Sequence, residues 1–314
     1  MPPRLPRSRR APSPSTDRPA ALVLGTWAGA APSGTIGDVS EEPSGLHRLA
    51  AAADRRRIAV IALRGVIGGA VRTGDLVRTL AEARRSARVR AVLLEIDSPG
   101  GSAAESEAIY LAVRRLAREK PVLAWIRTTG ASGAYFAACG ANRILAFPSA
   151  IVGSIGVISV RPVAVEALRR LGTSVQVTKT GPFKDLGAPW REPTEADQAK
   201  ERELVDAIFR RFTGAVAGAR GLDDARLARV TTGEVWLGVE AVSVGLVDAI
   251  CEDEEAALRE AQQLAGLPHR RLVRMGPRRS VLQRLGVPGA GMGPPGVRWI
   301  AEVEGWLRAP RVLL

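Results

Sequence analysis

Two residue types that often build active sites are scarce in this chain of 314 residues. The two cysteines, Cys139 and Cys251, lie far apart and in no metal-ligand spacing, so neither a disulfide framework nor a zinc site is indicated. The two histidines, His47 and His269, fall outside the expected core of strands and helices. We therefore expect buried free thiols, no metal or other cofactor, and no Ser-His-Asp triad.

Lysine is scarce as well. It occurs four times against 41 arginines, as Lys120, Lys179, Lys184 and Lys200. Arginine keeps its proton in proteins, whereas a buried lysine can lose one and act as a base. Because this chain uses arginine as its general surface cation, each lysine is a candidate for chemistry.

Long apolar runs are also absent. No stretch reaches the roughly 20 residues that a membrane-spanning helix needs, and the best candidate, residues 20–31, is short and contains two glycines. This run follows an arginine-rich start and loosely resembles a signal peptide, although we favour a peripheral tail. We expect a cytoplasmic or peripherally membrane-associated protein without a transmembrane helix.

The positive charge is concentrated at the two ends. The net charge is +13, of which residues 1–18 carry +4 and residues 269–314 carry +7. A basic stripe across a fold would indicate nucleic-acid binding, whereas basic ends are typical of solvated tails or of attachment to a membrane surface. We expect no nucleic-acid partner, and a peripheral membrane contact stays open.

Composition and periodicity divide the chain into three parts. Residues 1–56 are rich in Pro, Ser, Arg and Ala without a sustained period, which is typical of a tail and linker. Residues 57–268 form the expected catalytic domain. Residues 269–314 form a basic C-terminal extension, in which residues 297–307 carry tryptophan and valine at the spacing of an amphipathic helix. Such a helix is interpreted as a subunit contact, with docking on an anionic membrane as the alternative.

Strand and helix patterns alternate through the central part. Apolar β-branched runs predict strands, and apolar residues at helical spacing predict helices. Strands are expected at 58–63, 89–96, 121–126, 142–147, 151–160 and 174–178, with a last one before 248; helices are expected at 73–87, 102–118, 163–171, 194–219 and 253–265. This alternation predicts an α/β fold with right-handed crossovers and a largely parallel sheet.

Two glycine-containing turns follow predicted strands. In Asp97-Ser98-Pro99-Gly100-Gly101 the glycines allow close backbone approach, so free N–H groups can hold an oxyanion. In Gly130-Ala131-Ser132-Gly133-Ala134 a serine opens an alanine-rich helix with room for a substrate carbonyl. Taken singly, each motif is equally typical of an ordinary turn or helix cap.

A nucleophilic serine needs a base, and the scarcity of histidine leaves lysine. Lys184 follows a predicted strand and lies among apolar neighbours, where burial would lower its pKa. The alternatives are a surface lysine paired with Asp185, and Lys179 as the base instead. Lys120 and Lys200 lie in charged helical contexts, which are typical of solvated side chains.

These motifs, in this order, resemble the signal peptide peptidase A family of Ser/Lys peptidases, which have a ClpP- and crotonase-like fold with repeated ββα units. The matching stretches cover roughly residues 58–265 and are collinear: 97–101, 131–136, 152–158, 181–185, and 233 through 245–248.

The resemblance implies a role for each motif. Ser132 would attack the scissile carbonyl, Lys184 would take its proton, and Ser154 would orient the lysine or relay its proton. For Ser154 a structural cap is an equally good interpretation. Related enzymes assemble with their active sites facing inward, so a homo-oligomer is implied. The oxyanion hole would be formed by backbone amides around Gly100, Gly101 and Gly133.

The function expected from this resemblance is serine endopeptidase activity on hydrophobic peptides, such as cleaved signal peptide remnants. Three alternatives stay open at this point. The first is another activity on the same scaffold, such as acyl-CoA chemistry that uses the oxyanion hole. The others are a catalytically silent crotonase-like scaffold and a protein that binds a membrane surface through its basic ends. Dependence of an activity on both Ser132 and Lys184 separates the peptidase from all three.

Overall fold

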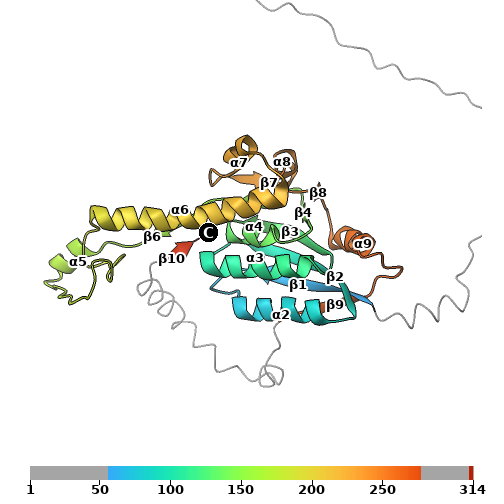
Figure 1. Cartoon of the computed structure of the whole chain (residues 1–314), viewed down its shortest axis with the longest axis horizontal. Coiled ribbons are helices and arrows are strands. Elements are labelled where there is room, and N and C mark those ends of the chain that lie inside the picture. The colour runs from blue at the N-terminus through green and yellow to red at the C-terminus, as the bar shows by residue number, and fades with distance from the viewer. Residues whose placement is uncertain (1–55, 277–310, 314) are drawn as a thin grey trace, which may run out of the picture. The chain divides into compact units, whose positions relative to one another are not determined.

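The computed structural model describes residues 56–276 and 311–313, and an eight-stranded, mostly parallel sheet forms its centre (Figure 1). Three long strands lie in the middle and pair in parallel. Helices connect them in the predicted order, which confirms the α/β class. These elements are β1 (Arg57–Arg64), α2 (Thr73–Arg85), β2 (Val89–Ser98), α3 (Ala103–Ala117) and β3 (Val122–Ala131).

Shorter strands extend the sheet on both sides. The order is β7-β5-β3-β2-β1-β9, with β4 paired to β3 and β8 paired to β4. The β5–β7 pair is antiparallel, and the other pairs are parallel. The short strands are β4 (Arg143–Ala146), β5 (Ile151–Gly153), β7 (Val235–Leu237), β8 (Ala249–Ile250) and β9 (Leu272–Met275).

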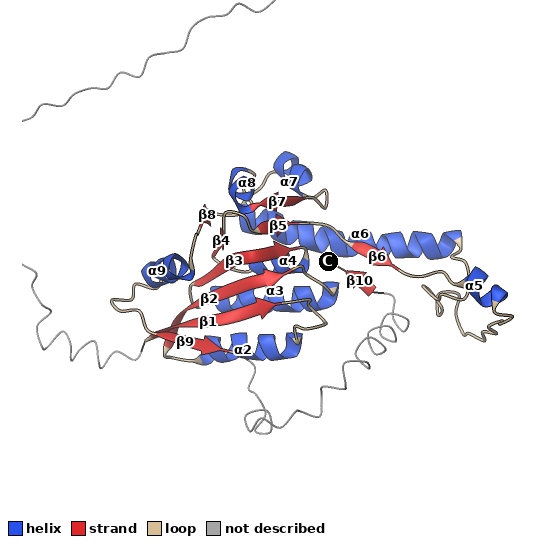
Figure 2. Ribbon diagram, turned by 180° about the vertical axis from the view of Figure 1, so that it is seen from behind, coloured by secondary structure: helices blue, strands red, loops and turns tan. Residues whose placement is uncertain are grey.

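Helices cover both faces of the sheet (Figure 2). Because side chains alternate along a strand, β1 sends Ile61 and Leu63 to one face and Ile58 and Val60 to the other. The first set packs in a large core with α2, α3, α4 and α6, and the second packs in a smaller core with α9. The remaining helices are α4 (Gly133–Ala138), α5 (Val165–Arg170), α6 (Glu195–Arg220), α7 (Asp224–Val230), α8 (Gly238–Ser243) and α9 (Glu254–Leu264).

Residues 158–194, here called the arm, contain β6 (Ile158–Val160), α5 and a long loop that leads into α6. Both views show α5 at the outer end of α6, away from α4 and the main sheet (Figures 1 and 2). The hydroxyl of Ser159 and the guanidinium of Arg161 contact the Glu201 carboxylate, which ties β6 to α6. The backbone of β10 (Arg311–Leu313) pairs with β6 in antiparallel fashion.

The structure differs from the sequence predictions in several elements. The strand predicted at 174–178 is wrong: these residues are exposed and pair with no neighbour in the described part of the chain. The single strand predicted at 151–160 is two strands, β5 and β6, separated by a turn. Helix α7 and the strands β9 and β10 were not predicted.

The domain boundaries stay predictions. The strands β9 and β10 fall in the expected extension after residue 268, and both pair with strands of the central part. The predicted tail up to residue 55 and the predicted amphipathic helix at 297–307 lie outside the described residues.

Candidate active site

Ser132 lies in the turn that joins β3 to α4, in a backbone conformation that side-chain-bearing residues rarely adopt. Its φ is 55° and its ψ is −123°. The turn is held in place from both sides: the Ser132 amide donates to the Gly153 carbonyl at 2.7 Å, and its carbonyl accepts from Phe136 at 3.0 Å. A strained serine in a sharp strand-to-helix turn is how hydrolases expose a nucleophilic hydroxyl.

Two glycines beside Ser132 are required by close packing. A Cβ at Gly133 would lie 2.1 Å from the Ser106 hydroxyl, and a Cβ at Gly101 would lie 2.1 Å from the Ile67 carbonyl. Gly101 also has a φ of 150°. The Cβ position of Gly133 lies 3.5 Å from the Gly101 amide nitrogen, so the two predicted oxyanion segments are neighbours.

The amides of these segments differ in their hydrogen bonds. The Gly100 amide donates to the Ser98 hydroxyl at 3.2 Å. Within the described residues, the amides of Gly101 and Gly133 have no acceptor. Buried amides without partners are uncommon, because each one loses its hydrogen bond to water. Two free N–H groups beside a serine are therefore available to a carbonyl oxygen of a ligand.

Ser154 follows β5 and also has a positive φ, of 50°. Its amide donates to the Glu234 carbonyl at 2.7 Å, just before β7. The Trp236 ring packs beneath the adjacent Gly153, where a Cβ would lie 2.9 Å from it. The β5–β7 pair thus fixes the turn that holds both Ser154 and, through the Gly153 carbonyl, Ser132. Sequence reasoning missed this contribution of β7, because it depends on backbone pairing.

A cavity of about 380 Å³ joins these elements. The side chains that line it are small or apolar, and none of its described lining residues is ionisable. Such surroundings suit an apolar ligand and disfavour a charged amine. The lining residues are Val66, Pro99, Gly100, Gly101, Ser132, Ser154, Gly156, Ile158 and Gly233.

Lys184 does not line this cavity. It lies in the arm, in the loop between α5 and α6, and its side chain is exposed. The fold of a single chain therefore brings Ser132, Ser154, Gly100 and Gly101 together around one cavity. It does not bring Lys184 to that cavity.

The alternative pairing of Lys184 with Asp185 is also not what the structure shows. The Asp185 carboxylate accepts instead from Lys179 at 2.7 Å and from Arg191 at 2.9 Å. These hydrogen bonds, that of Arg191 foremost, hold the pKa of the Asp185 carboxyl well below its usual range. Lys179 is thus a structural cation of the loop, and within the described residues the Lys184 ammonium has no carboxylate partner.

The other two lysines have structural surroundings. Lys200 pairs with Glu203 on the surface of α6. Lys120 is not simply solvated: it donates to the carbonyls of Ala83 and Ser86 at 2.8 and 2.6 Å, and so caps the end of α2. Burial lowers its pKa, with the charge of Arg90 as the next cause.

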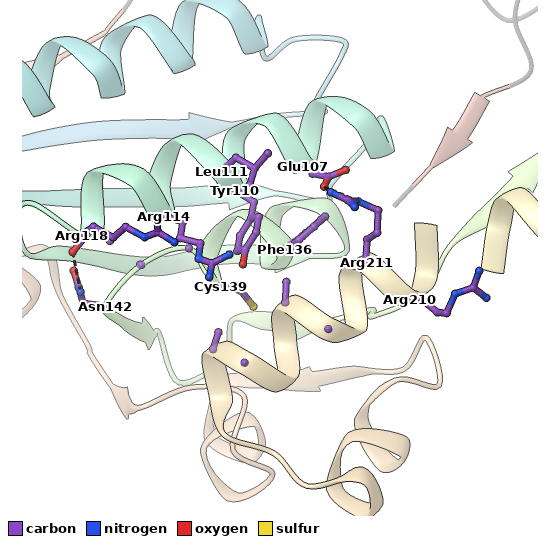
Figure 3. A pocket seen from close by; sticks show the side chains of 17 residues that line it. Glu107, Tyr110, Leu111, Arg114, Arg118, Phe136, Cys139, Asn142, Arg210 and Arg211 are labelled. Atoms are coloured by element: carbon purple, nitrogen blue, oxygen red, sulfur yellow. Dashed lines mark hydrogen bonds and ion pairs between the residues drawn. The ribbon is translucent and has the colours of Figure 1, made fainter. Parts of the chain in front are cut away.

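A larger groove, of about 550 Å³, lies between α3, the end of α4 and α6 (Figure 3). Arg114, Arg118 and Arg210 border it, and Cys139 lies in its floor. Burial raises the pKa of the Cys139 thiol to about 12, so this cysteine is a protonated core residue and not a nucleophile. The groove contains none of the predicted site residues.

Comparison with known proteins identifies the family to which the chain belongs. A family model described as peptidase family S49 matches residues 114–268, which include Ser132, Ser154 and Lys184. A protein of Synechocystis named as a putative protease is 33% identical over 215 residues, which cover 68% of this chain and 76% of that relative. The chain belongs to peptidase family S49, a family of serine-type peptidases.

Other S49 relatives differ in how much of their length the chain covers. A protein of Methanocaldococcus jannaschii named as a putative protease is 32% identical over 64% of this chain and 64% of its own length. The chloroplastic serine protease SPPA of Arabidopsis thaliana is 30% identical over 64% of this chain, but only 30% of its own length is covered. The S49 chain thus covers between about a third and about three quarters of the length of each of these three relatives.

A solved structure of the 1510-N membrane-bound stomatin-specific protease with a substrate peptide overlaps 74% of this chain and 96% of its own. The TM-score of this match is 0.45 and the sequence identity is 16%. In the described part of the S49 chain, no helix combines the length and the apolar character needed to cross a bilayer.

Proposed function

We propose that this S49 chain is an endopeptidase that cleaves hydrophobic peptides, such as cleaved signal peptide remnants, with Ser132 as nucleophile and Lys184 as general base. The observation that carries the proposal is the strained Ser132 in an uncharged cavity that Gly101 also lines, with the unpaired amides of Gly101 and Gly133 close by. The uncharged lining favours apolar substrate side chains and a neutral lysine.

The proposed reaction has two steps. Neutral Lys184 takes the proton of the Ser132 hydroxyl as its oxygen attacks the scissile carbonyl, and the amides of Gly101 and Gly133 donate to the resulting oxyanion. The lysine ammonium then protonates the leaving amine, and a serine ester remains. In the second step the lysine takes a proton from water as the water attacks the ester. The lysine ammonium returns this proton to the departing Ser132 oxygen, which releases the acid and restores the serine and the neutral lysine. Ser154 would hold the lysine in line with Ser132.

The lysine would come from a second copy of the chain. Lys184 is absent from the lining of the Ser132 cavity, whereas the arm that carries it exposes several apolar side chains. Leu171, with 77% of its surface exposed, and Phe183 are examples. Exposed apolar surface of this kind is typical of an interface. An arm packed on a neighbouring copy would bring Lys184 to that copy's cavity, which agrees with the expected homo-oligomer.

The test uses three proteins: wild type, Ser132→Ala and Lys184→Ala, assayed on a fluorogenic hydrophobic peptide. Each substitution is expected to lower kcat by at least about 10³-fold, because the two residues act as a unit. Substantial activity in Ser132→Ala would overturn the proposed nucleophile.

A mixture of the two inactive variants tests where the lysine comes from. When the variants are unfolded together and refolded, one site in four would pair an intact serine with an intact lysine, so about a quarter of wild-type activity is expected. No recovery, although each variant refolds to the wild-type oligomeric state, would show that the lysine acts within one chain.

A further inference from the structure

We propose that Arg191 is a positioning residue for the proposed base: by holding Asp185 and Asp197, it anchors the segment that bears Lys184 and keeps the neighbouring carboxylate from pairing with that lysine. The inference rests on the proposed function and deepens it. Arg191 itself would not touch the substrate.

The contacts of Arg191 form a two-sided clamp. Its Nε and Nη2 donate to the two oxygens of Asp185, each at 2.9 Å, in the bidentate geometry that favours arginine over lysine. Its Nη1 and Nη2 also donate to the Asp197 carboxylate. Both carboxylates are nearly buried, with 7% and 3% of their side-chain surfaces exposed. Ion pairs this well covered are held more firmly than surface pairs.

Asp197 connects the clamp to the body of the protein. It lies in the first turn of α6, where its carboxylate accepts from the Thr194 amide and the Thr194 hydroxyl caps the Asp197 amide. The same helix extends for 26 residues and places Phe212 and Val216 in the main core. Arg191 thus fixes the lysine-bearing loop to a rigid element.

The charges around Lys184 explain why the clamp matters for a base. In the loop, Lys179 and Arg191 pair with Asp185, and Arg191 also pairs with Asp197 at the start of α6. Glu192 adds one further carboxylate to the loop. The packed elements contribute charges that are already paired: Arg161 with Glu201 at β6 and α6, and Glu166 with Arg169 and Arg170 on α5. A free Asp185 carboxylate beside Lys184 would stabilise the ammonium and raise the pKa of that lysine.

The decisive measurement is the pH dependence of kcat/KM. A lysine base is active when neutral, so activity rises with pH through the pKa of the lysine. In Arg191→Gln the Asp185 carboxylate loses its two hydrogen bonds from Arg191 and keeps only Lys179. The less compensated charge should move this rise to higher pH by about one unit. Adding Asp185→Asn to Arg191→Gln should move it back towards the wild-type position. Arg191→Lys, which keeps the charge, should shift it less.

A matched control is Arg161→Gln, which breaks another arginine–carboxylate pair of the arm without touching Asp185. It should leave the pH of the rise unchanged. If Arg191→Gln lowers kcat/KM equally at every pH, or if Arg161→Gln shifts the profile as much, the proposed role of Arg191 is wrong.

A second readout does not require activity. In the Ser132→Ala background, an amine-reactive acylating reagent modifies Lys184 only when its side chain is neutral. The rate of this acylation, measured by mass spectrometry as a function of pH, therefore reports the pKa of Lys184 directly. Arg191→Gln should raise this pKa, and an unchanged pKa would contradict the proposal. Wild-type activity in Lys184→Ala would instead overturn the proposed base. If Lys184→Ala is inactive but the pH dependence of kcat/KM in Arg191→Gln equals that of the wild type, only the proposed role of Arg191 is wrong.

Discussion

Single residues decide most of the candidate site, and two glycines show how differently the same substitution acts. A Cβ added at Gly101 would collide with the Ile67 carbonyl, and Gly101 has a positive φ. A Cβ added at Gly214 on α6 would have no neighbouring atom within 4 Å. The first glycine is required by packing and the second is not. Glycine within a helix destabilises it relative to alanine.

Gly101→Ala is expected to lower kcat by on the order of 10²-fold, since the displaced amide can no longer face an oxyanion. It should also lower the melting temperature. The matched substitution Gly214→Ala should leave kcat unchanged and stabilise the protein by about 1 kcal/mol. Both effects are measured by the peptide assay and by thermal unfolding. Wild-type kcat in Gly101→Ala would contradict the assignment of this amide.

At the same scale, the motifs in the sequence and their resemblance to a known family pointed to Ser132, Ser154, Gly100 and Gly101, and the structure places all four around one cavity. It did not find Arg191. Charged residues six positions apart in a loop carry no periodic signal, and only the fold of the arm shows that Asp185, Arg191 and Asp197 meet. The sequence also did not show that Lys179 pairs with Asp185, which makes Lys179 a weaker candidate for the base.

Elements were predicted best where a hydrophobic period was long. The strands β1, β2 and β3 and the helices α2, α3 and α6 were all expected. The failure at 174–178 has a physical cause: alternating valines favour an extended chain, but a strand needs a partner, and the arm offers none there among the described residues. The strand β9 was missed for the opposite reason, because its pairing with β1 is determined by tertiary contact.

The strand β10 covers the edge of β6, next to the Ser132 cavity. It pairs with β6 so that Leu313 is opposite Ile158, and Ile158 lines the Ser132 cavity. Peptides commonly bind such edges as an added strand. A chain ending at residue 310 is therefore expected to show a lower KM for a hydrophobic peptide with unchanged kcat. Steady-state kinetics of the two chains tests this, and an equal or higher KM in the shorter chain would contradict it.

At the scale of the whole molecule, the separation of Ser132 from Lys184 makes the proposed activity depend on assembly. Activity per chain should fall on dilution and recover on concentration, because association follows mass action. Activity measured across a dilution series, alongside sedimentation velocity at the same concentrations, tests this. Constant activity per chain through dissociation into single copies would show that one chain holds a complete site.

The pairing of β9 with β1 has a consequence for how the chain is made. Ile58 of β1 lies opposite Leu272 of β9, so one edge of β1 stays unpaired until β9 has been synthesised. During synthesis at about 5–20 residues per second, β1 would keep an open edge for roughly 10–40 s. Open strand edges invite pairing with other chains. A nascent chain of this protein should therefore depend on protection at the ribosome until residue 275 has emerged.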